Sequence, residues 1–345
     1  MMYSRSVIFA GICLAAILIA GRPTTAQAAA NDRLLESYVS DEYELTVRVN
    51  TRRLLDAPEL DPIRNRILGP QVVQMVDGVQ QLTGINLLKD IDTLVFAGYF
   101  APEKRDDGLV FLRGRWDENA LILLFQMSPQ YERIPAGKVT IHGFWREKEK
   151  DMRYVAFLDL GIAVIGKKDG VEALVKVVED KSKQLTNVPG YAARLKDIPD
   201  DALVGLAAVK PRQLPQDKPG KILMKNTKAA CAFLDLKDGL RLMVMLEMND
   251  VQSMQNMKDI AQGILAVGQM IDDMPKIGEL AKKVQLSSKE TCVTATMSMP
   301  VDEARQTLAM IPALKMLAGP ARDSAGSAAD TTSGPATKSK APAGF

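Results

Sequence analysis

Histidine is almost absent from this chain of 345 residues, which contains only His142. One histidine excludes metal sites that need several imidazoles, and it restricts Ser-His-Asp or Cys-His catalysis to that position. The sequence also lacks phosphate-cradling glycine motifs, nucleophile elbows and zinc-ligand pairs. Because His142 stands between strand-forming neighbours, we expect it to be an ordinary strand residue. We therefore predict no catalytic residue, no cofactor and no metal ligand.

Apolar runs long enough to cross a bilayer are also missing. The apolar run at residues 7–20 has 14 residues, whereas a membrane-spanning helix needs about 20. It follows Arg5 and precedes the small-x-small pattern Ala26-Gln27-Ala28, as the core of a secretory signal does. We predict a signal peptide at residues 1–28, cleaved after Ala28 or alternatively after Ala30; an uncleaved anchor is the other interpretation. The mature protein would then be periplasmic or extracellular, without a transmembrane segment.

Neither sign of charge dominates. The precursor has 44 basic and 42 acidic residues, and the predicted signal peptide contains Arg5 and Arg22 but no acid. The mature chain therefore has a formal charge of zero. Without an overall positive field, we expect no binding of nucleic acid.

Cysteine is scarce as well. Cys231 and Cys292 remain after the predicted cleavage, and each lies in a strand-like segment. In an oxidising compartment such a pair can close a disulfide, or it can stay as two buried thiols. The sequence leaves both interpretations open.

What the chain does contain is a repeated order of strand, tight turn, strand and helix. Apolar periodicity, Asp-Gly turns and helix caps predict four copies. They are strands 91–100 and 109–116 with helix 118–125 after Asp117; strands 154–160 and 162–165 with helix 169–178; strands 232–236 and 240–248 with a long helix capped by Asn249 or Asp250; and strands 284–287 and 291–299 with helix 301–311. A lone strand, 43–49 or 202–209, precedes each pair of copies.

This order predicts an α+β fold in two tandem modules, 41–182 and 202–317, each an antiparallel sheet of hairpins with helices packed on one face. A linker at 183–201 would join them. The tail at 318–345 is rich in Ala, Gly, Pro, Ser and Thr, a composition typical of disorder.

The segment AFLDL occurs twice, at 156–160 and 232–236, and glycine turns at Gly161 and Gly239 follow it. With the repeated strand-turn-strand-helix order, this pattern resembles a loose class of exported bacterial domain-of-unknown-function proteins built from paired α+β modules behind a signal peptide. The resemblance covers most of the mature chain. It implies neither an activity nor functional residues.

Methionine is unusually frequent in the second half, where twelve of the 17 methionines lie between residues 224 and 316. Three interpretations are core packing, a deformable groove for an apolar ligand, and a thioether site for a soft metal such as Cu(I). The spacing favours the core. Met297 and Met299 alternate with residues of the opposite strand face, and the helix methionines, Met254 and Met257, are spaced with Val251, Ile260 and Ile264.

Our leading hypothesis is an exported envelope or periplasmic protein that binds or scaffolds without catalysis, through its sheet faces and the helix at 250–273. Its partner would be an unknown envelope protein or an apolar ligand. The alternatives are a carboxylate-dependent hydrolase outside the cytoplasm, and apolar-ligand or soft-metal binding by the Met-rich second module.

Overall fold

The computed structural model describes residues 34–57, 60, 76–78, 80–81, 84–86, 89–100, 107–146, 151–158, 161–210, 225–270 and 275–310. The predicted signal peptide and the predicted tail lie outside the described residues, and so do three of the twelve methionines of the second half, Met224, Met274 and Met316.

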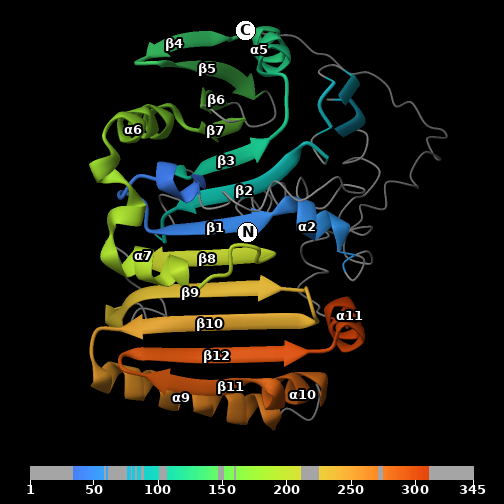
Figure 1. Cartoon of the computed structure of the whole chain (residues 1–345), viewed down its shortest axis with the longest axis vertical. Helices are drawn as coiled ribbons and strands as arrows, with labels where there is room; N and C mark the ends of the chain where they lie inside the picture. Colours follow the sequence, from blue (N-terminus) through green and yellow to red (C-terminus); the bar gives the residue numbers. More distant parts are fainter. Residues whose placement is uncertain are drawn as a thin grey trace, which may run out of the picture.

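The strands of this described part form a single antiparallel sheet (Figure 1). Its order is β11-β12-β10-β9-β8-β1-β2-β3-β7-β6-β5-β4. The strands are β1 Leu45–Asn50, β2 Ile91–Gly98, β3 Leu109–Gly114, β4 Glu132–Ala136, β5 Val139–Arg146, β6 Asp151–Leu158, β7 Ile162–Gly166, β8 Val204–Val209, β9 Thr227–Asp235, β10 Leu240–Met248, β11 Gln285–Lys289 and β12 Cys292–Met299. The predicted α+β class with antiparallel pairing is confirmed.

Two of the predicted helix caps are confirmed. Asp117 caps α5 by accepting hydrogen bonds from two backbone amides, and Asp250, rather than Asn249, caps α9. The α-helices are α2 Thr51–Asp56, α5 Glu118–Gln126, α6 Lys168–Glu179, α7 Pro189–Lys196, α9 Val251–Gln269, α10 Pro275–Lys283 and α11 Val301–Met310, and the short 3-10 turns are η2 Glu36–Tyr38, η5 Lys181–Lys183 and η6 Leu185–Asn187. Helix α7 falls inside the predicted linker, and its Tyr191 is fully buried, so this segment is part of the core.

The two lone strands meet at the centre of the sheet. β1 pairs with β8 along its length, from Leu45 opposite Ala208 to Val49 opposite Val204. Outward from this seam, β2, β3, β7 and β6 on one side correspond in order to β9, β10, β12 and β11 on the other, and the β4–β5 hairpin is an addition to the first half. The AFLDL segments do not mark equivalent strands, because β6 corresponds to β11 rather than to β9.

One sheet therefore contains the strands of both predicted modules, instead of a separate sheet in each. The largest buried cluster also draws on both halves, with Phe111 and Leu174 from the first and Cys231 and Phe233 from the second. Two tandem modules are not confirmed.

Helices cover both faces of the sheet. Successive residues of a strand point to opposite faces, and here they pack in two different buried clusters, each with its own helices. Odd-numbered residues of β2 and β3, such as Val95 and Phe111, pack with η2, α6 and α7. Even-numbered residues, such as Leu94 and Val110, face the side of α2. Further out on that same face lie α5, over β5 and β6, and α9, against β10 and β12 (Figure 1). The expected arrangement, with the helices of each module on one face, is thus wrong for the first module, where α6 lies opposite α2 and α5. In the second module α9, α10 and α11 do share one face.

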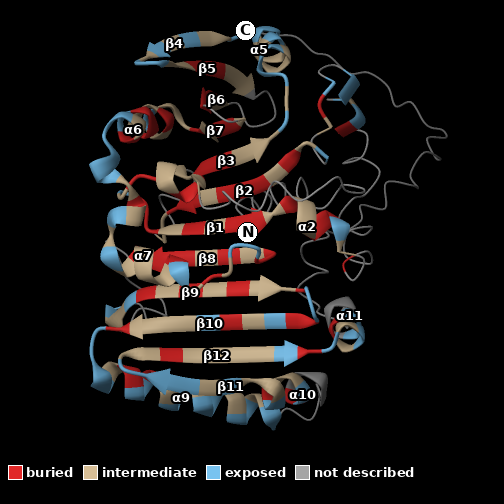
Figure 2. Cartoon of the chain, viewed as in Figure 1, coloured by how far each residue is buried: buried red, intermediate tan, exposed pale blue. Residues whose placement is uncertain are grey.

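Helix α9 departs from the predicted core pattern. Met254 and Met257 are buried with Met248 and Val293, as expected. The residues that helical spacing placed in the core beside these methionines are instead exposed: Val251, Ile260 and Ile264. Val267 and Met270 are exposed as well. Figure 2 shows this helix largely in the exposed colour. The reason is geometric, because residues 260, 264 and 267 lie along a stripe about 90° from the line of contact with the sheet.

No helix in the described ranges combines the length and the apolar character needed to span a bilayer.

Candidate functional site

A cavity lies between α5 and the outer strands of the first half. Its volume is about 460 Å³. Glu118, Asn119, Ile122 and Gln126 of α5 form one wall. The remaining lining comes from Tyr131 and the strands β4 to β6 with their turns: Arg133, Lys138, Val139, Thr140, His142, Phe157 and Leu158.

His142 forms the inner end of this cavity. It lies in β5, as predicted, and only 4% of its surface is exposed. Its Nδ1 and the Tyr131 hydroxyl are 2.7 Å apart in a hydrogen bond. Burial, and secondarily the positive charge of Arg133 on the paired strand β4, lower the pKa of His142 below 6.5. The imidazole is therefore neutral at pH 7.

The charged side chains of the cavity are mostly cationic. Arg133 and Lys138 are exposed at its mouth, and Glu118 is the single carboxylate in the lining. These groups leave an excess of one positive charge. A neutral imidazole, a phenol hydroxyl and the Thr140 hydroxyl add hydrogen-bonding groups without further charge.

A second cavity, of about 510 Å³, lies at the other end of α5. Its lining is mainly apolar and consists of Leu124, Phe125, Met127, Ser128, Pro129, Gln130, Phe144 and Trp145. The Trp145 backbone N–H donates to the Ser128 hydroxyl (3.0 Å), which fixes the loop after α5 against β5.

Aromatic rings lie between the two cavities. Phe125 of α5 stacks on Phe144 at a centroid distance of 4.7 Å and lies 6.4 Å from Phe157. Phe157, a lining residue of the first cavity, is 6.0 Å from His142. No residue of α5 is fully buried, although five consecutive residues, 121–125, are apolar. The helix is thus an apolar cover that the sheet only partly contacts.

The single histidine makes the site directly observable. In the ¹H NMR spectrum of the mature protein, we expect one pair of imidazole C–H resonances, both titrating with a midpoint below 6.5. Because the folded protein binds this proton less readily than the unfolded chain, the stability contribution is complete above pH 6.5 and is lost as the pH falls below it. His142→Gln should remove this part of the pH dependence of unfolding. A midpoint above 6.5 would contradict the buried, neutral state.

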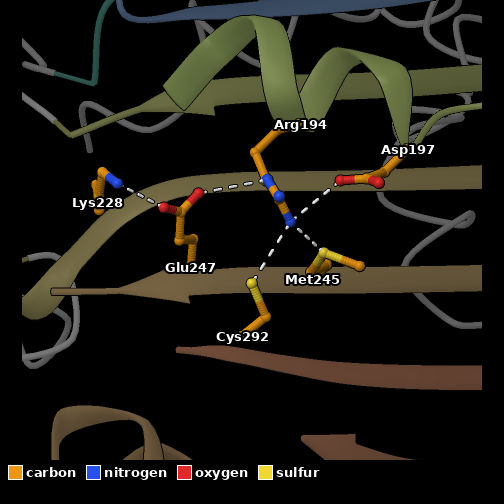
Figure 3. Close-up of polar contacts among 6 residues, drawn as sticks. All are labelled: Arg194, Asp197, Lys228, Met245, Glu247 and Cys292. Atoms are coloured by element: carbon orange, nitrogen blue, oxygen red, sulfur yellow. Dashed lines mark hydrogen bonds and ion pairs between the residues drawn. The ribbon is translucent and has the colours of Figure 1, made fainter. Parts of the chain in front are cut away.

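On the opposite face of the sheet, Cys292 and Met245 lie beside Arg194 of α7 (Figure 3). Its guanidinium pairs with Asp197 at 3.1 Å and with Glu247 of β10 at 3.4 Å. It also contacts the sulfur of Met245 and lies 3.6 Å from that of Cys292. Lys228 completes the network by pairing with Glu247 at 2.7 Å. The network attaches α7 to the second half of the sheet.

Cys231 and Cys292 are both free thiols, so no disulfide joins them. Cys231 lies in β9 and Cys292 in β12, with β10 between these strands. Two strand spacings amount to about 10 Å, beyond the 7 Å between Cα atoms that a disulfide tolerates. The sequence could not exclude a bridge, because strand order depends on contacts distant in the chain.

The thiols are also poorly reactive. Burial, reinforced by Asp197, raises the pKa of Cys231 to about 12, and burial raises the pKa of Cys292 despite the nearby Arg194. We expect two free thiols in unfolded, never-reduced mature protein, and slow alkylation of both by iodoacetamide at pH 8 in the native state. Recovery of a linked Cys231–Cys292 peptide from non-reduced protein would contradict the strand order.

Some of the described methionines are buried in the core, and others are exposed at the surface. Met243, Met254, Met257 and Met299 are buried, as the core interpretation predicts, whereas Met270 is exposed. Within the described residues, no group of three or more His, Cys, Asp or Glu side chains is placed to hold a metal ion.

Sequence reasoning missed the α5 cavities, although a signal was present. The chain has 2 Trp, 7 Tyr and 9 Phe. Both tryptophans lie at this end of the sheet, as do three phenylalanines, Phe125, Phe144 and Phe157. This gathering of aromatic residues in an aromatic-poor chain becomes visible only when the strands are placed side by side.

Comparisons with known proteins identify no family for this chain. No protein-family model and no curated protein matches the chain. Among solved structures, it is similar to crystal form I of TP0453, with 9% identity and a TM-score of 0.42 over 79% of this chain and 95% of that chain.

Proposed function

We propose that this is an exported, non-enzymatic binding protein that holds a small organic anion in the cavity beneath α5. The observation that carries the proposal is the composition of that cavity: Arg133 and Lys138 at the mouth, and buried, neutral His142 at the inner end. Small ligands typically bind in concave sites where a few converging polar groups fix their orientation. The exposed lining of this cavity is mainly polar, and Ile122, Val139, Phe157 and Leu158 add the apolar part.

Charge favours an anion over a cation or a neutral ligand. A carboxylate at the mouth would accept charge-assisted hydrogen bonds from a guanidinium and an ammonium, which are stronger than bonds between neutral groups. The preformed bond between Tyr131 and His142 keeps the inner end rigid. Binding rather than hydrolysis is supported because Glu118 is the single carboxylate in the lining, whereas hydrolysis by paired carboxylates requires two.

The test is calorimetric titration of the mature protein with 2-naphthoate and with its neutral isostere, 2-naphthamide. We expect the carboxylate to bind more tightly, and the double variant Arg133→Gln/Lys138→Gln to weaken its binding about tenfold or more, since hydrogen bonds to charged groups contribute about 1.5–3 kcal/mol. The matched control is Lys282→Gln/Lys289→Gln, which removes the same charge from exposed positions at the opposite end of the sheet. Equal affinity for the two probes, or equal loss in both double variants, would refute the proposal.

A further inference from the structure

The second cavity differs in chemical character from the first. Of the described residues that line it, none is charged, and its exposed surface is mainly apolar. The first cavity has a mainly polar surface with three charged side chains, Glu118, Arg133 and Lys138. No described residue lines both cavities. From this contrast we infer that the second cavity is a separate binding site, which takes an uncharged, mainly apolar small molecule.

Packed aromatic rings keep the two cavities apart. Phe125 and Phe144 stack with their centroids 4.7 Å apart and their planes inclined by 12°, and Phe157 lies 6.4 Å from Phe125. Phe125 and Phe144 line the second cavity, whereas Phe157 lines the first. A molecule in the second cavity therefore lies beyond this ring layer from Arg133 and Lys138, and their charges do not select it.

The uncharged lining selects against an ion. A carboxylate or an ammonium that enters this cavity loses part of its hydration without gaining a counter-charge, which costs binding free energy. A neutral polar group can be accommodated, because the Ser128 hydroxyl and the Gln130 amide both donate and accept hydrogen bonds. The Ser128 hydroxyl already accepts from the Trp145 backbone N–H at 3.0 Å, and this bond fixes its position.

Size and exposure favour occupation by a small molecule. The volume of about 510 Å³ falls within the range of about 300–1,000 Å³ that is usual for small-molecule sites. Met127 lines the cavity although its side chain is 74% exposed. A ligand that covers Met127 removes apolar surface from water, and the flexible thioether can adapt to its shape.

The experiment reads each cavity at its own NMR signal. The Cε methyl group of Met127 reports on the second cavity, and the imidazole C–H protons of His142 report on the first. The probes are 2-naphthamide and 2-naphthoate, which share a ring system and differ in charge. In the mature protein, we expect naphthamide to shift the Met127 methyl with an affinity about tenfold above that of naphthoate at the same methyl, because the carboxylate would lose hydration without a counter-charge. Met127→Leu assigns the resonance.

Neighbouring leucines of α5 supply a matched pair of variants. Leu124 lines the cavity and is half-buried, whereas Leu123 is 63% exposed and is not part of the described lining. Leu124→Gln should weaken naphthamide at Met127 about threefold or more, and Leu123→Gln by less than about twofold, because only the first removes apolar contact with the ligand. Intermolecular nuclear Overhauser effects between naphthamide and the Met127 methyl are the second measurement, in case Leu124→Gln lowers the melting temperature.

Three outcomes would overturn the inference. They are the absence of a Met127 shift with naphthamide, equal affinity of the two probes at Met127, and equal weakening by Leu123→Gln and Leu124→Gln. An equal shift of the Met270 methyl, which is 77% exposed at the end of α9, would show general adsorption to apolar surface and would overturn it as well. The anion site is judged separately, because its signal is at His142 and depends on Arg133 and Lys138, so either proposal can fail while the other stands.

Discussion

Arg48→Met is expected to lower the free energy of unfolding by about 3–5 kcal/mol, the usual cost of breaking a buried ion pair by removing one partner. Arg48 lies in the central strand β1, and its side chain is 3% exposed, while that of Glu36 is 1% exposed. Their closest charged atoms are 3.7 Å apart, and the Arg48 guanidinium also donates to the Pro199 carbonyl at 2.8 Å. Methionine fills similar space but removes the guanidinium that pairs with the buried carboxylate of Glu36.

The control is the double variant Glu36→Gln/Arg48→Met, in which both charges of this pair are removed. It should recover most of the lost stability, because a neutral amide is far less costly to bury than a carboxylate. Urea unfolding followed by circular dichroism measures both variants, and an unchanged m-value is required for the comparison. A loss below 1 kcal/mol in the single variant would mean that water reaches Glu36 in the folded protein.

The seam between β1 and β8 is a feature that the sequence does not predict. Strand and helix positions follow from local signals, such as the Asp117 cap and the Gly161 turn, whose φ of 69° suits glycine. The pairing of β1 with β8 has no local signal, because the two strands are about 150 residues apart in the chain. The buried hydrogen bond between Thr46 and Tyr191 (2.6 Å) is equally distant, so helix α7 looked like part of a linker.

The candidate site could not be predicted from the sequence for the same reason. His142 was correctly predicted as a strand residue, but nothing in its neighbourhood in the sequence indicates that α5 covers it. The wall residues Glu118, Tyr131 and Phe157 come from helix α5, the loop before β4 and strand β6, and each is ordinary in its own segment. Only the position of β5 beside β6 near the edge of the sheet brings them around one cavity.

Two substitutions on the same helix should differ sharply in cost. Met257→Ala is expected to lower the free energy of unfolding by about 2–5 kcal/mol, because Met257 is 7% exposed and packs in the cluster with Met248, Met254 and Val293. Ile264→Ala, two turns further along α9, should change it by no more than about 0.5 kcal/mol, because 67% of Ile264 is exposed. Alanine's higher helix propensity partly offsets the small loss of contact there.

The comparison tests which face of α9 meets the sheet, since spacing in the sequence placed both residues in the core. Urea unfolding of the two variants at one protein concentration gives the two costs under identical conditions. Similar losses of unfolding free energy at both positions would support the single apolar face of α9 that the sequence pattern predicted. A large loss at Ile264 with a small one at Met257 would mean that α9 is rotated about its axis. In that case the methionines at 254 and 257 would face solvent, and the core interpretation of the second half would be wrong for this helix.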